Sequence, residues 1–367
     1  MDNNVALIAQ CEAKAKQWLT PDFDETTRKA VQAMLDNADK TELVESFYRD
    51  LEFGTGGLRG IMGAGTNRMN IYTVGMATQG FANYLKKNFK DRKQISTVVC
   101  YDCRNNSDLY ARTVANIFSA NGIKVYLFDE MRPTPECSFA IRHFGAQGGV
   151  NLTASHNPRE YNGYKAYWED GAQVLAPHDK GIIDEVGKVT IADVKFEGNN
   201  DLIQMVGADV DEQIKTICID PEVIRHQHDL KIVYTPLHGA GRVLIPQSLK
   251  YWGFDNVHCV AEQMVKDGNF PTVDRPNPEF AEALTLGLRD AKQLDGGRHS
   301  HGQRSRRRPR RYGLQERQGR VGAHQWQPDL PDLPLVYHHQ SSGGGQDEAD
   351  RLHREDHRHH GGDSRDS

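Results

Sequence analysis

The chain has 367 residues, 38% of them hydrophobic and 26% charged, which is enough for two domains with hydrophobic cores. Its 45 basic and 50 acidic side chains give a formal net charge of -5, so no overall charge favours nucleic acid or an anionic membrane as a partner. No apolar run approaches the roughly 18 residues of a membrane-spanning helix, and the N-terminus lacks the features of a secretory signal. Six cysteines are too few for a disulfide scaffold. We therefore expect a cytoplasmic protein.

The first 44 residues are predicted to form a helical extension, because apolar residues recur there at helical spacing. A first α/β domain is expected over 45–200, where short apolar runs alternate with amphipathic stretches. Helices are expected at 5–19, 24–35, 41–51, 72–89, 109–121 and 135–144. Strands are expected at 97–101, 124–128 and 149–153. This alternation is typical of an α/β fold with mixed or parallel doubly wound sheets.

A second α/β domain is expected over 205–295, and the sequence pattern makes it only partial. Its strands are expected at 230–235 and 256–261, and its helices at 242–252 and 278–294. A further strand is due after the last helix, but residues 298–305 are basic and polar and cannot supply a buried strand. We therefore expect the neighbouring strand to keep an open edge, which would make this domain marginally stable.

Residues 296–367 differ from the rest of the chain in composition. They contain no Lys, Ile, Phe, Met, Thr, Asn or Cys, and they hold nine of the 16 histidines together with a basic run at 304–311. Because so few aliphatic side chains cannot offset the entropy of ordering, we expect a disordered tail that proteases cut readily after about residue 295.

Polar residues follow the expected strand at 149–153, at the edge of the sheet where open α/β folds bind ligands. The order is Ser155, His156, Asn157 and Pro158, with Lys165 further on. A serine on such a loop, with backbone N–H groups and a cation nearby, can hold a phosphoryl group. The alternative is a simple turn whose bend Pro158 fixes. A serine hydrolase is disfavoured, because the chain has no G-x-S-x-G elbow.

Several motifs accompany this loop in a fixed order. They are FGTGGLRG at 53–60, YDCR at 101–104 followed by Ser107, TASHNP at 153–158, NGYKAYW at 162–168 and YTPLHG at 234–239. Together they resemble the α-D-phosphohexomutase family, which includes phosphoglucomutases and phosphomannomutases, and most of all its phosphoglucomutase-2 and phosphopentomutase branch. The resemblance runs from about residue 45 to residue 294, and it implies a phosphohexomutase domain I followed by part of domain II.

The resemblance implies an enzyme that shifts phosphate between two oxygens of one hexose or pentose phosphate through a sugar bisphosphate. Ser155 matches the phosphoserine, whose phosphate oxygen also ligates the metal. Arg59 and Lys165 match cations facing the transferring phosphate, and His156 matches a residue that assists proton transfer or orients the loop. The implied cofactors are Mg²⁺ and a sugar bisphosphate activator, and the implied partner is a small phosphosugar, with neither nucleic acid nor membrane.

Three further residues, Thr153, Asn157 and Arg104, are candidates for substrate or phosphate binding on the same resemblance. A surface ion pair remains the alternative for Arg59, and a solvated charge at a helix end remains the alternative for Lys165.

The cysteines and histidines outside this loop favour structural roles. Cys100 and Cys103 have C-x-x-C spacing but no second pair, so we favour buried thiols over a zinc or redox site. We expect His238, in a turn after a strand, to be structural. The basic run in the tail resembles a nucleic-acid signal only in composition.

The carboxylate loop Asp-x-Asp-x-Asp-Arg, which the family uses to bind Mg²⁺, has no counterpart after residue 294. Codons permitted for residues 296–313 can be chosen so that, read one base later, they encode ADVIVMASDPDADRVGM, an apolar strand followed by such a loop. We hypothesise that one extra base after the Asp295 codon shifted the frame, so that residues 296–367 are translated out of frame. Coding DNA incompatible with that peptide would refute the hypothesis.

Two functions are consistent with these observations. The first is a phosphosugar mutase of the isomerase class that is inactive in this form. The second is a non-catalytic fragment or binding protein with a basic, histidine-rich tail. Salt-sensitive retention of nucleic acid that disappears when residues 296–367 are deleted would favour the second function. The sequence does not predict the sugar preference or the oligomeric state.

Overall fold

The structure is a computed structural model that describes residues 2–54, 56–217, 220–294 and 335–336. The expectations of a disordered and out-of-frame tail therefore lie almost entirely outside the described residues, as do Thr55 and Cys218. Among the helices that are described, none is long and apolar enough to cross a membrane.

Three N-terminal helices pack around a small aromatic core. They are α1 (Asp2–Gln17), α2 (Glu25–Asp36) and α3 (Thr41–Phe47). The Trp18 and Phe23 rings stack with centroids 4.6 Å apart, and Phe23 lies at the same distance from Tyr72 on the first helix beyond the extension. The third helix ends earlier than expected, because the chain turns back after Phe47 and the Leu51 N–H donates to the Thr66 carbonyl.

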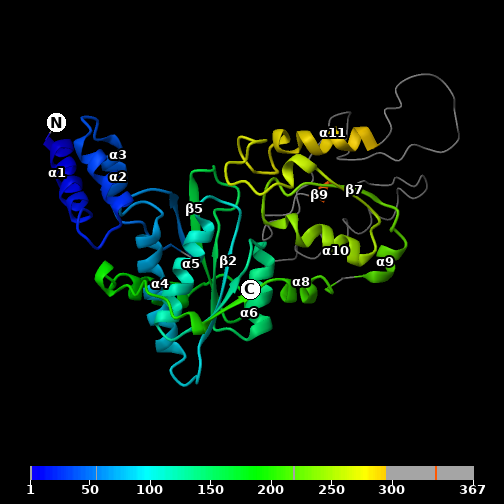
Figure 1. Ribbon diagram of the computed structural model, residues 1–367, viewed down its shortest axis with the longest axis horizontal. Coiled ribbons are helices and arrows are strands. Elements are labelled where there is room, and N and C mark those ends of the chain that lie inside the picture. Colours follow the sequence, from blue (N-terminus) through cyan, green and yellow to red (C-terminus); the bar gives the residue numbers. More distant parts are fainter. Residues whose placement is uncertain (1, 55, 218–219, 295–334, 337–367) are drawn as a thin grey trace, which may run out of the picture.

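A six-stranded mixed sheet forms the centre of the molecule (Figure 1), with strand order β1-β5-β4-β2-β3-β6. The strands are β1 (Gly57–Ile61), β2 (Ser96–Tyr101), β3 (Lys124–Phe128), β4 (Gly148–Leu152), β5 (Tyr161–Trp168) and β6 (Ile203–Val206). Strands β4, β2, β3 and β6 run parallel, whereas β5 is antiparallel to both β4 and β1. The expected α/β class with mixed sheets is confirmed. Residues 203–206, which straddle the expected boundary near 205, belong to this first sheet.

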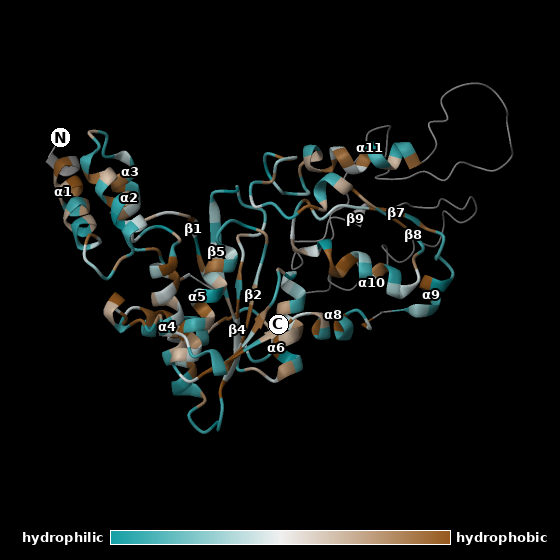
Figure 2. Ribbon diagram, in the orientation of Figure 1, coloured by the Kyte–Doolittle hydropathy of each residue, from teal (hydrophilic) through white to brown (hydrophobic). Residues whose placement is uncertain are grey.

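Helices cover both faces of the sheet and bury its apolar strands. On one face lie α4 (Ile71–Asn88), α5 (Ser107–Ala120) and α7 (His178–Val186), and on the other lies α6 (Thr134–Phe144). Phe81 and Phe118 pack with Val99 on the first face, and Ile141 packs with Val98 on the second. Figure 2 shows hydrophobic residues on β2, at the centre of the sheet.

The second α/β unit has a three-stranded sheet in the order β8-β7-β9. Its elements are α8 (Ala208–Ile214), α9 (Pro221–Arg225), β7 (Lys231–Tyr234), α10 (Leu244–Trp252), β8 (Asn256–Cys259), α11 (Thr285–Leu294) and β9 (Leu335–Val336). The expectation of an open edge is wrong along Val233 and Tyr234, because Val336 and Leu335 pair antiparallel with them. The expected helix at 278–294 is shorter, with one 3₁₀ turn at Ala281–Leu284 preceding α11.

Candidate functional site

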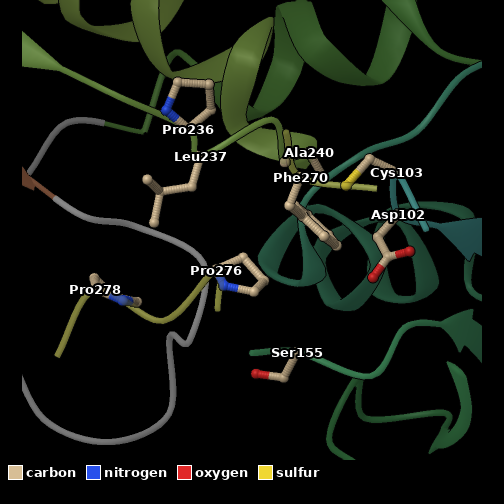
Figure 3. A pocket seen from close by; sticks show the side chains of 10 residues that line it. Asp102, Cys103, Ser155, Pro236, Leu237, Ala240, Phe270, Pro276 and Pro278 are labelled. Atoms are coloured by element: carbon tan, nitrogen blue, oxygen red, sulfur yellow. The ribbon is translucent and has the colours of Figure 1, made fainter. Parts of the chain in front are cut away.

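Ser155 lies on the loop that follows β4, at the edge of the sheet where the parallel strands end. Its backbone is left-handed, with φ of +54°, a conformation that costs a non-glycine residue roughly 1 kcal/mol or more. The Ser155 N–H donates to the Thr153 hydroxyl over 3.0 Å, and the Asn157 N–H donates to the Ala154 carbonyl. These bonds hold the turn so that the Ser155 hydroxyl points into a pocket (Figure 3).

Arg104 ties this loop to the neighbouring strand β2. Its guanidinium donates four hydrogen bonds to backbone carbonyls, at distances of 2.6–3.0 Å. The acceptors are the carbonyl oxygens of Ser155, Asn157, Pro158 and Tyr161. Arg104 is only 3% exposed and also faces the Asp102 carboxylate, whose oxygen lies 3.5 Å from Nε. All four terminal N–H groups of this cation are therefore engaged by the loop.

Two other cations lie on the antiparallel part of the sheet. Arg59 on β1 is paired with Gly163, and Lys165 on β5 is paired with Gly57, so both cations lie on the same face of the sheet. Arg59 donates to the side-chain oxygen of Asn157 over 3.3 Å. Desolvation by the neighbouring loop lowers the pKa of the Arg59 guanidinium, and the nearby charge of Arg104 lowers it further.

The close packing of β1, β5 and the serine loop requires a glycine at position 163. A Cβ atom at this position would lie 2.5 Å from the Thr153 carbonyl oxygen and 3.0 Å from that of Leu58. The motif NGYKAYW thus contributes a close backbone approach as well as a lysine.

His156 is exposed beside Ser155. Its Nδ1 lies 3.4 Å from the serine Oγ, at the outer limit of a hydrogen bond. The structure therefore gathers around one loop six of the residues that the sequence singled out as site candidates. These are Arg59, Arg104, Thr153, Ser155, His156 and Asn157. The seventh, Lys165, lies on β5 opposite Gly57 and Asn151.

Loops of the second domain complete the pocket on its far side (Figure 3). Asp102, Cys103 and Ser155 line it from the first domain, whereas Pro236, Leu237, Gly239, Ala240, Phe270, Pro276 and Pro278 line it from the second. Of these residues, Phe270, Pro276 and Pro278 were not predicted from the sequence. Their signal was weak, because the segment between β8 and α11 has no helical or strand periodicity.

The described residues do not fit a magnesium site of the implied kind. Within them, no group of three or more acidic, histidine or cysteine side chains could hold a metal ion. Asp102 lines the pocket together with Ser155, but its Oδ1 already accepts from the Arg104 backbone N–H and the Ser107 hydroxyl.

The remaining candidates have structural environments, as expected. Cys100 and Cys103 are buried and form no disulfide with the residues that the structure describes, and burial raises the pKa of Cys100 well above its usual range. His238 is fully buried between the Val265 carbonyl and the Thr272 hydroxyl, at 2.8 Å from each.

Comparison with known proteins gives two family matches. Residues 50–192 match the model of phosphoglucomutase/phosphomannomutase alpha/beta/alpha domain I, and residues 211–297 match that of domain II. The chain is 37% identical over 294 residues to a human phosphopentomutase, covering 76% of this chain and 48% of that protein. It is 37% identical over 271 residues to a phosphoglucomutase of Staphylococcus haemolyticus, covering 72% of this chain and 49% of that protein.

A third relative is the human glucose 1,6-bisphosphate synthase, which is 36% identical over 301 residues, covering 77% of this chain and 48% of that protein. Among solved structures, a protein of Thermus thermophilus described as a phosphomannomutase matches with a TM-score of 0.57 and 24% identity, over 72% of this chain and 54% of that one. That likeness concerns the fold alone. The chain spans about half the length of the curated relatives that it matches.

Proposed function

This chain belongs to the phosphoglucomutase/phosphomannomutase family, and from that premise we propose that Ser155 exchanges a phosphoryl group with a phosphosugar. In the forward step, phosphoserine gives its phosphoryl group to a free hydroxyl of a sugar monophosphate, so that a bisphosphate forms and the serine Oγ is released. In the return step, Oγ attacks the other phosphorus and the sugar oxygen leaves. The substrate is a hexose or pentose monophosphate, and a sugar bisphosphate loads the free serine.

The observation that carries this proposal is the position of Ser155 at the end of β4, with Arg59 and Lys165 on one face of the adjoining strands. Phosphoryl transfer needs little covalent help but needs positive charge against the equatorial oxygens and an aligned nucleophile. Arg59 and Lys165 supply the charge. The fixed left-handed turn supplies the alignment.

His156 is the residue best situated to handle the serine proton. In the return step, the Ser155 hydroxyl loses its proton as the bond to phosphorus forms. The imidazole Nδ1, 3.4 Å away, can accept this proton after a small rotation of either side chain. In the forward step the roles reverse: the imidazolium returns a proton to the serine Oγ as that oxygen leaves, and the attacking sugar hydroxyl gives its proton to water. In the return step, water likewise supplies the proton of the sugar oxygen that leaves.

In this proposal, Thr153 positions the nucleophile Ser155, and Asn157 positions Arg59. The Thr153 hydroxyl accepts the Ser155 N–H, and the Asn157 amide oxygen accepts from Arg59. No step is assigned to Mg²⁺, because the described residues offer it no carboxylate cluster.

The experiment incubates the full chain with labelled glucose 1,6-bisphosphate and locates the phosphate by peptide mass spectrometry. We expect one phosphoserine, at Ser155, that is lost in Ser155→Ala and retained in the matched control Ser138→Ala, a serine on α6 outside the pocket. Equal labelling of wild type and Ser155→Ala would overturn the proposal.

A further inference from the structure

Phe270 belongs to the second domain but covers a side chain of the first. Its ring centroid lies 5.5 Å from the guanidinium carbon of Arg104. Phe270 is 5% exposed and lines the same pocket as Ser155 (Figure 3). An aromatic ring of the second domain therefore shields the cation that holds the serine loop.

The segment around Phe270 docks on the loop that carries Arg104. The side-chain amide nitrogen of Asn105 donates to the side-chain oxygen of Asn269 over 3.0 Å. Gly268 packs so closely that a Cβ atom there would lie 2.6 Å from the Asn105 backbone nitrogen and 2.9 Å from the Cys103 carbonyl oxygen. The two loops thus meet backbone to backbone, immediately beside Arg104.

His238 fixes the Phe270 segment within its own domain. It bridges the Val265 carbonyl and the Thr272 hydroxyl, and its ring meets the Phe270 ring edge to face at 6.5 Å. Phe270 itself adopts a left-handed backbone, with φ of +50°. A bulky residue in this conformation indicates that its surroundings hold it there.

We propose that Phe270 is a positioning residue for Ser155, which makes the geometry of the serine loop depend on docking of the second domain. The effect of this positioning on reactivity rests on the proposed function, because the alignment of Ser155 matters for chemistry only if Ser155 carries phosphate. The physical link is Arg104, which touches the ring on one side and four carbonyls of the serine loop on the other.

The ring acts on the loop by excluding water from the guanidinium. Water would compete with the carbonyls for the same N–H groups, and hydrogen bonds to a charged donor are stronger in a low-dielectric setting. The face of the ring also attracts the cation directly. Removal of the ring therefore loosens the four bonds that hold Ser155 in its left-handed turn.

The primary test is amide hydrogen exchange in the full chain, which does not depend on activity. In Phe270→Ala, peptides covering 154–163 should exchange at least about tenfold faster, while peptides from β2 and β3 keep their protection. Gly268→Ala should act in the same direction, because it separates the two loops and leaves the ring intact. The matched control is Phe280→Ala, whose ring also stands over an arginine, Arg275 at 5.7 Å, but is 43% exposed and outside the pocket.

A folded Phe270→Ala protein with unchanged exchange at 154–163 would overturn the inference. If Phe270→Ala loses protection throughout the chain, Phe270→Leu takes its place as the test, because it keeps most of the apolar volume. A smaller increase in exchange at 154–163 is expected from it. A second readout is the rate at which a labelled sugar bisphosphate phosphorylates Ser155, which should fall about tenfold in Phe270→Ala, or 1.36 kcal/mol, and stay unchanged in Phe280→Ala. Absence of Ser155 labelling in wild type would refute the proposed function and leave the exchange result to decide the positioning role.

Discussion

Arg59 and Arg104 are both cations close to the serine loop, but they bond to different groups. Arg104 is buried and bonds to four carbonyls, whereas Arg59 is exposed at the surface and has one bond to the Asn157 side chain. The two arginines should therefore respond differently to substitution.

Arg59→Ala is expected to slow phosphorylation of Ser155 by about 10²-fold or more, because one preorganised positive group facing the equatorial oxygens is lost. Its urea unfolding should remain within about 0.5 kcal/mol of wild type, since the side chain is exposed. Arg104→Lys should instead lower the free energy of unfolding by about 2–4 kcal/mol, much more than Arg59→Ala, because an ammonium cannot donate to four carbonyls in this geometry. Stopped-flow labelling and urea titration of both variants measure the contrast, and similar stability losses in the two would contradict it.

Glu136 is a residue whose charge state should govern stability above neutral pH. It is fully buried on α6, and burial, together with the nearby Asp211 carboxylate, raises the pKa of Glu136 to about 10. Arg132 lies between the two acids and pairs in a bidentate manner with Asp211, at 2.8 and 3.0 Å. The folded chain thus keeps a proton on Glu136 that the unfolded chain releases above about pH 4.5.

This buried acid makes stability fall as the pH rises from about 4.5 toward about 10, by at most about 1.4 kcal/mol per pH unit. Glu136→Gln, a neutral side chain of the same shape, should flatten this dependence and be more stable than wild type at pH 8 but similar to it at pH 5. Urea midpoints measured at pH 5, 6, 7 and 8 give the comparison, with the exposed Glu197→Gln as control. Parallel pH profiles for wild type and Glu136→Gln would show that the carboxyl is ionised in the fold.

At the scale of elements, the start of α2 connects the N-terminal helices to α4. The Asp24 carboxylate accepts the Thr27 N–H at 2.9 Å and the Tyr72 hydroxyl at 2.9 Å. Partial burial opposes ionisation, but the hydrogen bonds from Thr27 and Tyr72 outweigh it and lower the pKa of Asp24. One side chain therefore both caps a helix and joins two parts of the fold.

Asp24→Ala should lower the free energy of unfolding by about 1–2 kcal/mol, which is the usual loss for an N-cap. Asp24→Asn keeps a good cap and should lose less. Since the lowered pKa stabilises the folded state only while Asp24 is ionised, the difference between wild type and Asp24→Asn should shrink as the pH falls through the acid range. Thermal unfolding at pH 7 and pH 3.5 tests both statements, and a difference that grows in acid would refute the second.

The central strands of the first sheet could be predicted from the sequence, whereas the antiparallel strands could not. Strands β2 and β3 are rich in β-branched and aromatic residues, and β4 is fully buried although it contains Gly148, Gly149 and Asn151. The bounds of all three agree with expectation to within one residue. Strands β1 and β5 were read only as motifs, because glycines and polar residues hide their alternation. Their pairing brings Arg59 and Lys165 onto one face, so the chemistry could be named from the motifs but its geometry could not.

Across the whole molecule, the candidate site lies where two domains meet, and this part was the least predictable from sequence. Phe270 reaches Arg104 across about 166 positions of the chain, and local patterns carry no record of such a contact. The Arg242–Glu130 ion pair, at 2.6 Å, is a second link of this kind. The serine loop could be predicted from its local sequence motifs, whereas the second-domain residues that line the pocket opposite Ser155 are identified only by the tertiary fold.

We expect Ser155 to accept a phosphoryl group, but we expect sustained mutase turnover to be absent from the 367-residue chain. Residues 296–367 contain no counterpart of the carboxylate loop, and loss of metal stabilisation in phosphoryl transfer costs several kcal/mol, or several orders of magnitude in rate. The assay follows glucose 1-phosphate conversion with Mg²⁺ and a bisphosphate, and it compares this chain with a frame-restored chain and that chain's Ser155→Ala variant. Robust turnover by the 367-residue chain would contradict the expectation.

The contact between Phe270 and Arg104 also has a consequence for synthesis on the ribosome. The first sheet has all its strands once β6 has emerged, at Val206, but Arg104 stays without its aromatic cover until Phe270 follows. At about 5–20 residues per second, the 64 residues from 206 to 270 take about 3–13 s to translate. During that interval we expect the nascent chain to present the first sheet with a loosely held serine loop, which would tighten only when the second domain docks on it.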